Sequence, residues 1–284
     1  YSNETFLIKY GDGSSATGLW VTDKLKFGGV VIEDMIFGYA TKQTAGQGVL
    51  GIGLKNGEAS TWLDRPFQYD NFPFKLKTEN LIAKAAYSLY LNSPKAKAGS
   101  ILFGALDKAK YKGALAWLKL ENIDFNGHPI EQGTNFYVSL DSVTNKDDTN
   151  ILQKSTAALL DSGTTLTYAP LNVVNAIGRK YGKYNRFMGG YITSCSVKGA
   201  PVNFQFGNTT ISVPFENFLY DLSRDSPMYT HDECLIGIIS SGKNTFILGD
   251  GFLRSAYVVY DLEDRRCGVA QAVYSNQTEI EILH

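Results

Sequence analysis

The sequence has 284 residues, 44% of them hydrophobic, and a formal net charge of −1 at pH 7. That length can bury one large core or two moderate ones, and the near-zero charge argues against electrostatic binding of nucleic acid. No apolar run approaches the roughly 20 residues that a membrane-spanning helix needs. Three scattered histidines and the lack of a Cys-x-x-Cys pair argue against zinc, so we expect neither a metal nor a cofactor. Because the sequence starts at Tyr1 without an initiator Met, we also expect a processed fragment.

Short runs in which apolar and polar residues alternate dominate the chain and predict a mostly β protein. Gly, Asn and Asp separate these runs, as hairpin turns require. We expect helices over 74–85 and 170–181 and a helical turn over 214–219, the last two after prolines that suit a first helical turn. Strands are expected over 5–10, 18–22, 26–32, 86–91, 99–103, 114–120, 136–140, 202–206 and 256–261.

The three cysteines favour an oxidising compartment. Cys195 and Cys234 each lie beside turn-like sequence, and a bridge between them would contribute about 3–4 kcal/mol in the chain-entropy model. Two buried free thiols are the alternative. Cys267 opens an apolar run and is expected to be a small buried hydrophobe.

One acidic turn stands out because it occurs once. Four small or apolar residues, 157–160, deliver Asp161 to Ser162-Gly163, and two hydroxyls follow at Thr164 and Thr165. A strand that ends at such a turn directs its carboxylate outward, where hydroxyls and backbone N–H groups hold it ionised. One carboxylate does not easily act as both acid and base, and the sequence has no second Asp-Ser-Gly or Asp-Thr-Gly. Either the partner acid lies on another chain or the site is inactive.

An internal repeat suggests two related lobes. Gly48-Val-Leu-Gly-Ile-Gly53 is similar to Phe246-Ile-Leu-Gly-Asp-Gly251. Each pairs two bulky apolar residues with a glycine, as expected where one strand passes close behind another backbone, although short apolar runs with glycine are also common in β proteins. With Asp161, the repeat predicts two lobes that each contribute one strand crossing and one acid.

Five ordered motifs resemble landmarks of the pepsin-like aspartic proteases. Tyr10-Gly-Asp-Gly-Ser-Ser-Ala-Thr-Gly18 resembles their flap hairpin, and Ala158-Leu-Leu-Asp-Ser-Gly-Thr-Thr165 resembles the active-site motif of their second lobe. The resemblance spans about 6–273 and implies a mostly β, bilobal pepsin-like fold, with 1–112 as the remainder of the N-terminal lobe and 113–284 as the C-terminal lobe. The other matches are Ser100-Ile-Leu-Phe-Gly-Ala-Leu-Asp107, Ile247-Leu-Gly-Asp-Gly-Phe-Leu253, and Tyr257-Val-Val-Tyr-Asp261 with Gly268-Val-Ala270.

The resemblance also implies a missing piece. Family members carry a first Asp-Thr-Gly upstream of the flap, whereas this sequence begins just before the flap, so the start of the N-terminal lobe is absent. A cut at that place is similar to the yapsin-type fungal enzymes. We therefore expect the larger subunit of a two-chain, yapsin-like enzyme, held noncovalently or through Cys267 to a smaller N-terminal chain with the first Asp-[Thr/Ser]-Gly.

By this resemblance the chain is expected to be an aspartic endopeptidase that cleaves peptides or proteins and binds pepstatin-type inhibitors. Two carboxyls sharing a proton would activate a water molecule between them, and Asp161 would be one of the two. Thr164 would hydrogen-bond its carboxylate, and Gly163 would let the substrate backbone approach. Ordinary strand hydroxyls are the alternative for Thr164 and Thr165.

The flap residues complete the expected substrate site. Gly11 and its neighbours would let the hairpin close over an extended peptide, and Tyr10 would pack against it. Asp12 would pair with a basic substrate residue, and Val49 would line the adjoining apolar pocket. The alternatives are a plain hairpin aromatic for Tyr10, an acid that stabilises its own turn for Asp12, and a core residue for Val49.

Glycosylation acceptors at Asn3, Asn208 and Asn276 fit a secreted or cell-surface protein, and a lipid-anchor signal would lie beyond His284. Two other functional classes stay open. The chain could be an inactive pepsin-like binding protein that lost an acid, or a structural β protein whose Asp-Ser-Gly is a turn.

Overall fold

The computed structural model describes residues 2–145, 149–152 and 154–284. The chain divides into two compact units, Tyr1–Ala86 with Leu283–His284, and Tyr87–Ile282. The first unit contains β1 (Ser2–Lys9), β2 (Ser15–Phe27), β3 (Val30–Gln43), the 3-10 turns η1 (Lys55–Gly57) and η2 (Ala59–Trp62), and α1 (Phe72–Thr78).

The second unit holds most of the strands. Their bounds are β4 (Ala86–Tyr90), β5 (Ser100–Phe103), β6 (Ala105–Asp107), β7 (Tyr111–Lys119), β8 (Tyr137–Leu140), β9 (Ser142–Thr144), β10 (Thr156–Leu160), β11 (Thr167–Ala169), β12 (Lys183–Asn185), β13 (Gly190–Ser194), β14 (Val202–Phe206), β15 (Thr209–Val213), β16 (Leu219–Asp221), β17 (Glu233–Ile236), β18 (Ile238–Ser240), β19 (Phe246–Leu248), β20 (Ala256–Asp261), β21 (Arg266–Ala272) and β22 (Ile280–Ile282). Its helices and 3-10 turns are η3 (Lys108–Lys110), α2 (Leu171–Gly178), η4 (Phe215–Phe218), η5 (Leu222–Arg224) and α3 (Asp250–Leu253). None of the helices in the described part of the chain is long and apolar enough to cross a membrane.

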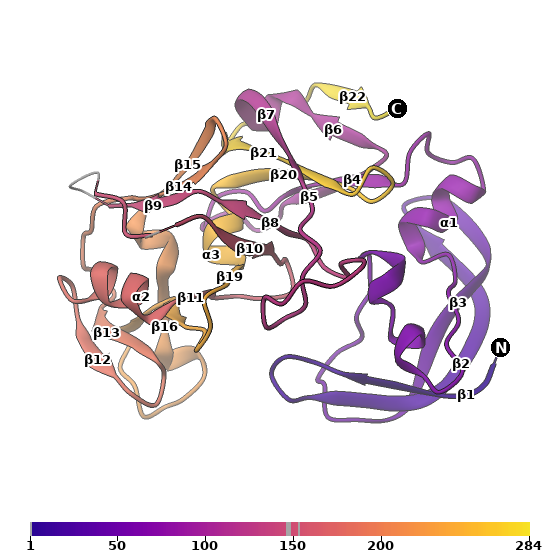
Figure 1. The fold of residues 1–284 in the computed structure, drawn as a ribbon, viewed down its shortest axis with the longest axis horizontal. Helices are drawn as coiled ribbons and strands as arrows, with labels where there is room; N and C mark the ends of the chain where they lie inside the picture. Colours follow the sequence, from indigo (N-terminus) through magenta and orange to yellow (C-terminus); the bar gives the residue numbers. More distant parts are fainter. Residues whose placement is uncertain (1, 146–148, 153) are drawn as a thin grey trace. The chain divides into compact units, whose positions relative to one another are not determined.

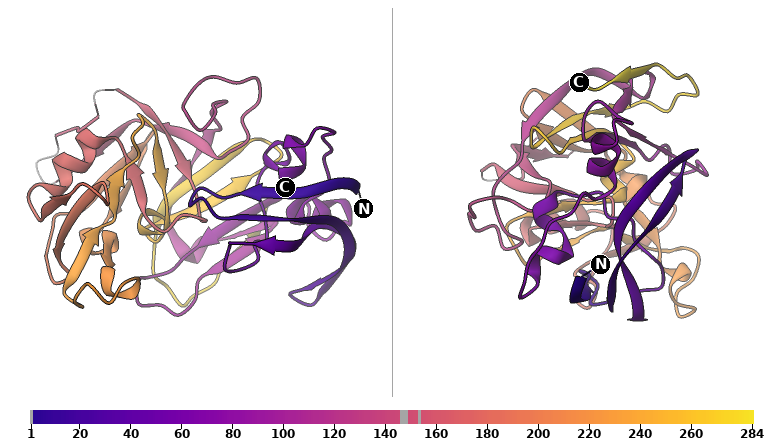
Figure 2. Two further views of the ribbon diagram at one scale, coloured as in Figure 1. Left: turned by 90° about the horizontal axis from the view of Figure 1, so that it is seen from below. Right: turned by 90° about the vertical axis from the view of Figure 1, so that its right-hand side faces the viewer.

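In the first unit, β1, β2 and β3 form an antiparallel sheet in chain order, which Figures 1 and 2 show as a long twisted ribbon. Gly28 and Gly29 have φ of 56° and 83° and make the two-residue turn between β2 and β3, the backbone geometry of a type I′ hairpin. The expected single strand over 26–32 is therefore wrong, since the chain reverses at its centre.

The second unit is built around two five-stranded sheets, ordered β18-β11-β19-β10-β8 and β5-β4-β20-β21-β7. All six residues of β20 are buried, because neighbouring strands lie on both of its edges and side chains cover both faces. Since β4, β5 and β7 share this sheet with β20 and β21, the compact second unit begins at residue 87. The expected lobe boundary between 112 and 113 falls inside it.

Most predicted elements are confirmed, with shifts at their ends. The two proline-led predictions hold, because Pro170 precedes α2 and Pro214 precedes η4. The helix expected over 74–85 is wrong in its bounds. It is α1, which starts at Phe72 and ends at Thr78, just before Asn80 adopts a φ of 57°, a backbone conformation that cannot continue a right-handed helix.

Cys195 and Cys234 form the expected disulfide, which joins β17 to the end of β13. Cys267 is the free cysteine and is 0% exposed, and burial raises the pKa of its thiol. The expectation of a buried hydrophobe is confirmed. The Cys267 sulfur is buried, so the expected disulfide from it to another chain would have no accessible thiol in this structure.

The glycosylation acceptors are exposed where they are described. Asn208 lies in the turn between β14 and β15, and Asn276 lies before β22, and both side chains are exposed. The side chain of Asn3 lies outside what the structure describes. Their modification stays a prediction.

Candidate active site

Asp161 stands at the end of a buried strand. In β10 the last three residues are buried, and the strand runs parallel to β19, with Leu160 opposite Leu248. The Asp161 N–H donates to the Leu248 carbonyl at 3.2 Å, which continues that pairing by one residue. The apolar strand therefore fixes the backbone, while the acid itself is only half-buried.

Two donors orient the Asp161 carboxylate, one at each oxygen. The Gly163 N–H donates to Oδ1 at 2.9 Å, and the Thr164 hydroxyl donates to Oδ2 at 2.7 Å. Bonds to an ionised acceptor are short and strong. The predicted hydrogen bond from Thr164 is confirmed, and Ser162 and Gly163 beside it are exposed.

The loop after Asp161 passes directly against Gly249. A Cβ on Gly249 would lie 2.1 Å from the Thr164 carbonyl oxygen, so only glycine fits. The Asp250 N–H donates to that oxygen at 2.8 Å, and the Gly251 N–H donates to the Thr165 carbonyl at 3.3 Å. The expected strand crossing is confirmed for the second copy of the repeat, and the Thr165 side chain is exposed.

The first copy of the repeat differs. Residues 48–53 form no strand, and a Cβ on Gly51 would meet no heavy atom of the described chain within 4 Å. Among the described residues, none comes within 4 Å of a Cβ on Gly51, so the expected crossing in the first lobe stays a prediction.

A second acid, Asp250, lies in the electrostatic field of Asp161. Burial raises the pKa of Asp250, Arg254 opposes the rise, and the charge of Asp161 adds to it. The sequence pattern alone does not assign Asp250 a role. The sequence feature that could have pointed to Asp250 is its place in the second repeat, directly after Gly249, where the two backbones cross.

Buried aromatic rings lie behind the end of β10. Tyr87 and Tyr260 stack at 4.8 Å between centroids, and Phe136 meets Tyr260 edge-on at the same distance. The Tyr260 hydroxyl donates to the Leu160 carbonyl at 3.5 Å. Burial holds the pKa of both phenols well above the usual value, so both stay neutral beneath Asp161.

The predicted flap is a tight hairpin between β1 and β2. The Tyr10 N–H donates to the Ser14 carbonyl at 2.8 Å, and Gly13 has a φ of 84°. Asp12 is exposed and accepts the Ser14 N–H at 2.8 Å, and bonds from Ser14 lower its pKa. Asp12 thus stabilises its own turn, as one of the two interpretations expected, while Gly11 has open space around it.

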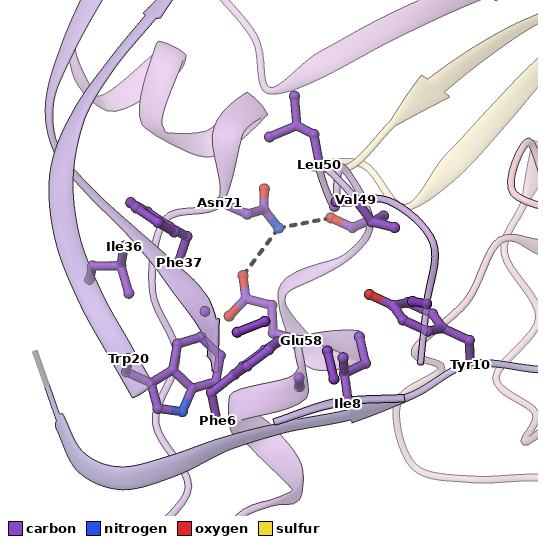
Figure 3. A pocket seen from close by; sticks show the side chains of 18 of the residues that line it. Phe6, Ile8, Tyr10, Trp20, Ile36, Phe37, Val49, Leu50, Glu58 and Asn71 are labelled. Carbon is purple, nitrogen blue, oxygen red and sulfur yellow. Dashed lines mark hydrogen bonds between the residues drawn. The ribbon is translucent and has the colours of Figure 1, made fainter. Parts of the chain in front are cut away.

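Tyr10 and Val49 both line a cavity of about 400 Å³ within the first unit (Figure 3). Val49 is 64% exposed, so the core alternative for this residue is wrong. Gly48, Gly51 and Gly53 of the first repeat also contribute to the wall.

A buried polar pair, which the sequence reasoning missed, faces this cavity. The Asn71 amide donates to Glu58 Oε1 at 3.1 Å and to the Gly53 carbonyl at 3.0 Å, and the Tyr69 N–H donates to Glu58 Oε2 at 3.3 Å. Burial raises the pKa of Glu58 to about 7. No local motif marks this pair, because its surroundings come from the tertiary fold.

The structure thus gathers Asp161, Gly163, Thr164 and Thr165 on one loop of the second unit. It places Tyr10, Gly11, Asp12 and Val49 within the first unit. Within the described ranges, no group of three or more His, Cys, Asp or Glu side chains is placed to hold a metal ion. The chemistry that the loop offers is that of one oriented, accessible carboxylate.

Known proteins match this chain over almost its whole length. The family model for eukaryotic aspartyl proteases matches residues 1–272. An acid protease of Saccharomycopsis fibuligera is 50% identical over 269 residues, which are 95% of this chain and 67% of that protein. Secreted aspartic protease 9 of Candida albicans is 37% identical over 98% of this chain and 51% of its own length. The chain therefore spans between half and two thirds of these curated relatives.

A solved structure shows the same fold. The crystal structure of an aspartic proteinase from Irpex lacteus superposes with a TM-score of 0.80 at 20% identity, covering 97% of this chain and 83% of that one. The expected mostly β, pepsin-like aspartic proteinase fold is confirmed. With the family match over residues 1–272 and the oriented Asp161 carboxylate, this shows that the chain belongs to the eukaryotic aspartyl protease family.

Proposed function

We propose that this chain is part of an aspartic endopeptidase in which Asp161 is one of two catalytic carboxyls. The observation that carries the proposal is the Asp161 carboxylate itself, which Gly163 and Thr164 orient at the end of a buried strand. The ionised member of the pair takes a proton from a bound water, and the water attacks the scissile carbonyl while the protonated member supports the oxyanion. Because the pair titrates together, neither role belongs permanently to Asp161.

The second carboxyl belongs, in this proposal, to an Asp-[Thr/Ser]-Gly outside the 284 residues. Its support is chemical, since the mechanism needs two acids and the sequence has one such triplet. Following the yapsin-like interpretation, we place the second triplet on a smaller N-terminal chain of the same precursor. Because Cys267 is buried, that chain is held noncovalently.

The substrate is an extended peptide or protein segment. We assign contacts with it to Tyr10, Gly11 and Asp12 of the hairpin, to Val49, and to Gly163 and Thr165 beside Asp161. Asp12 gives a preference for Lys or Arg, because an exposed carboxylate can pair with a cation. The names of the Candida relatives, the disulfide and the exposed Asn208 and Asn276 support secretion.

The test uses the product of the complete precursor. We expect it to hydrolyse peptides, to be inhibited by pepstatin, and to lose activity by roughly 10²–10⁴-fold when Asp161 is replaced by Asn. Asp34→Asn is the matched control, because Asp34 is exposed and its φ of 53° suits Asn. A wild-type product that binds pepstatin but never hydrolyses peptides would favour the inactive binding protein.

Intact mass under denaturing conditions, with and without reductant, tests the two-chain form. We expect a second, smaller chain containing Asp-[Thr/Ser]-Gly in both measurements. One continuous polypeptide with activity would overturn the two-chain form and leave the protease proposal standing.

A further inference from the structure

Charged residues are unevenly distributed along the second unit. Residues 162–215 contain no Asp or Glu but five of the 27 Lys and Arg residues, in a chain whose formal net charge is −1. Four of the five lie within eight positions of each other, and all four are exposed: Arg179, Lys180, Lys183 and Arg186. The small net charge of the whole chain therefore conceals a local excess of positive charge.

The positive charge of this segment is not neutralised by nearby acids. Within the described part of the chain, three of the four cations form no ion pair: Arg179, Lys183 and Arg186. The acids on the neighbouring strand lie at the far end of the sheet. Glu233, which begins β17, lies opposite Ser194, the last residue of β13, and Asp232 accepts the Ser194 hydroxyl at 2.8 Å. The turn between β12 and β13 lies at the other end of β13.

That turn carries an exposed phenylalanine. Phe187 is 96% exposed, more than any other large hydrophobic side chain of the described residues. Asn185 Oδ1 accepts the N–H groups of Phe187 at 3.0 Å and of Met188 at 3.1 Å, and Gly189 has a φ of 64°. An Asn side chain that accepts the backbone N–H two residues ahead fixes the shape of a turn. The exposed position of the ring is therefore a property of an ordered turn.

The base of the hairpin is anchored in the second unit. The Ser240 N–H donates to the Gly189 carbonyl at 2.8 Å. Tyr191 of β13 packs against α2 so closely that a Cβ on Gly178 would lie 2.3 Å from its ring, and α2, β12 and β13 lie side by side in Figure 1. A packed base thus supports a turn that holds an apolar ring in solvent.

Exposed cations around an apolar ring suit the surface of an anionic membrane. An apolar side chain enters such a surface by about 5–10 Å, while Lys and Arg are attracted to the headgroups. A strand rises about 3.3 Å per residue, so Lys183 lies at most roughly 13 Å from Phe187 along the hairpin. With the ring inserted, Lys183 is within about one Debye length, roughly 8 Å, of the headgroups. A soluble polyanion would use the cations and leave the ring in water, so Phe187 favours the bilayer.

We propose that the hairpin of β12 and β13 docks the protein on an anionic lipid bilayer. Phe187 inserts below the headgroups, and the four exposed cations of residues 179–186 face the lipid phosphates. Because one ring and a few cations carry the contact, binding is reversible and weakens as the salt concentration rises.

Sedimentation with lipid vesicles tests the docking, using the product of the complete precursor. We expect binding to vesicles of phosphatidylcholine with about 30% phosphatidylglycerol, and none to phosphatidylcholine alone. Raising NaCl from about 0.1 M to about 0.5 M should release the protein. Equal binding to both kinds of vesicle, or binding to neither, would overturn the proposal.

A pair of apolar substitutions tests the insertion of the ring. We expect Phe187→Ser to lower the partition coefficient on anionic vesicles by at least about tenfold, because the ring no longer leaves water. Met228→Ser is the matched control, since Met228 is 86% exposed and lies outside the basic segment, and it should bind like wild type. Equal binding by wild type and the Phe187 variant would overturn insertion.

A pair of double charge substitutions tests the contribution of the cations. We expect Lys183→Gln with Arg186→Gln to lower the partition coefficient by roughly 10–30-fold. Lys95→Gln with Lys97→Gln changes the net charge equally at two exposed lysines elsewhere and should lower it far less. Equal losses in both double variants would show a general charge effect and overturn the assignment to this hairpin. The Tm of every variant is measured alongside, so that losses are compared between folded proteins.

Heparin-agarose separates the bilayer from a soluble polyanion. A protein that binds heparin but not the anionic vesicles would overturn the proposal in favour of an anionic polymer. Vesicle binding that needs both Phe187 and the cations supports it, whether or not the product hydrolyses peptides.

Discussion

Thr164 Oγ1 lies 2.7 Å from Asp161 Oδ2, and the two residues are three positions apart on a loop that Gly249 allows to pass. The hydroxyl therefore holds one carboxylate oxygen, while the Gly163 N–H holds the other. From these two hydrogen bonds we predict that removing the Thr164 hydroxyl lowers catalytic activity.

Thr164→Val removes the hydroxyl and keeps the shape of the side chain. A hydrogen bond to a charged group contributes about 1.5–3 kcal/mol, so we expect kcat/KM of the complete enzyme to fall by roughly 10–150-fold. KM should change little, because the bond acts on the catalytic acid. Thr164→Ser should restore most of the activity. A valine variant with full activity would contradict a positioning role for this hydroxyl.

Glu58 should make the stability of the protein depend on pH. Its pKa is raised from 4.5 to about 7 in the folded state, so the folded protein holds this proton more tightly than the unfolded chain does. The contribution is therefore full below about pH 4.5 and is lost as the pH rises through 7. The charged neighbours that act on it are Lys55 and Asp70.

Glu58→Gln keeps the side-chain shape and removes the titration. We expect the difference in Tm between wild type and variant, measured from pH 4 to pH 8, to shift by several degrees in favour of the variant as the pH rises. Two Tm profiles that stay parallel over this range would show that Glu58 does not titrate in it.

The disulfide should stabilise the second unit. Replacing Cys195 and Cys234 together by Ala should lower the free energy of unfolding by about 3–4 kcal/mol, measured by urea denaturation.

Cys267 should react with iodoacetamide only after unfolding, because it is 0% exposed. Rapid alkylation of the native protein at Cys267 would contradict the buried assignment.

Asp12→Thr tests the proposed preference for basic residues. Thr preserves a short polar side chain in the turn, so we expect cleavage beside Lys or Arg to fall while cleavage of peptides without basic residues is kept. A matched pair of substrates that differ only in that residue gives the measurement. Equal loss for both would assign Asp12 to the turn alone, through its bond from Ser14.

Local sequence was enough to predict the loop at Asp161. The acid, Gly163 and Thr164 lie within four residues, so both donors of its hydrogen bonds are its near neighbours in the sequence. The disulfide required a pairing of two cysteines 39 positions apart, which their turn-like surroundings in the sequence favoured. Prolines marked α2 and η4, because proline fixes the backbone at the first turn of a helix.

What the sequence did not reveal depends on neighbours distant along the chain. The alternation over 26–32 hid a turn, because two adjacent glycines with positive φ reverse the chain inside a β-like pattern. Glu58 and Asn71 are polar residues that look exposed in sequence, and the fold buries them together. The open space at Gly51 could not be predicted either. The two repeats have similar apolar sequences, but the backbone packs tightly against Gly249, whereas no described atom lies within 4 Å of a Cβ on Gly51.

The pairing of β10 with β19 also sets an order of events during synthesis. The Thr164 carbonyl receives the Asp250 N–H, from a residue that is translated almost ninety positions after Asp161. A nascent chain that has not yet reached residue 250 contains the acid and its hydroxyl partner but lacks the backbone that supports their loop. We therefore expect the loop that holds the carboxylate to be fully supported only after residue 250 has joined it, since contacts between distant residues form slowly.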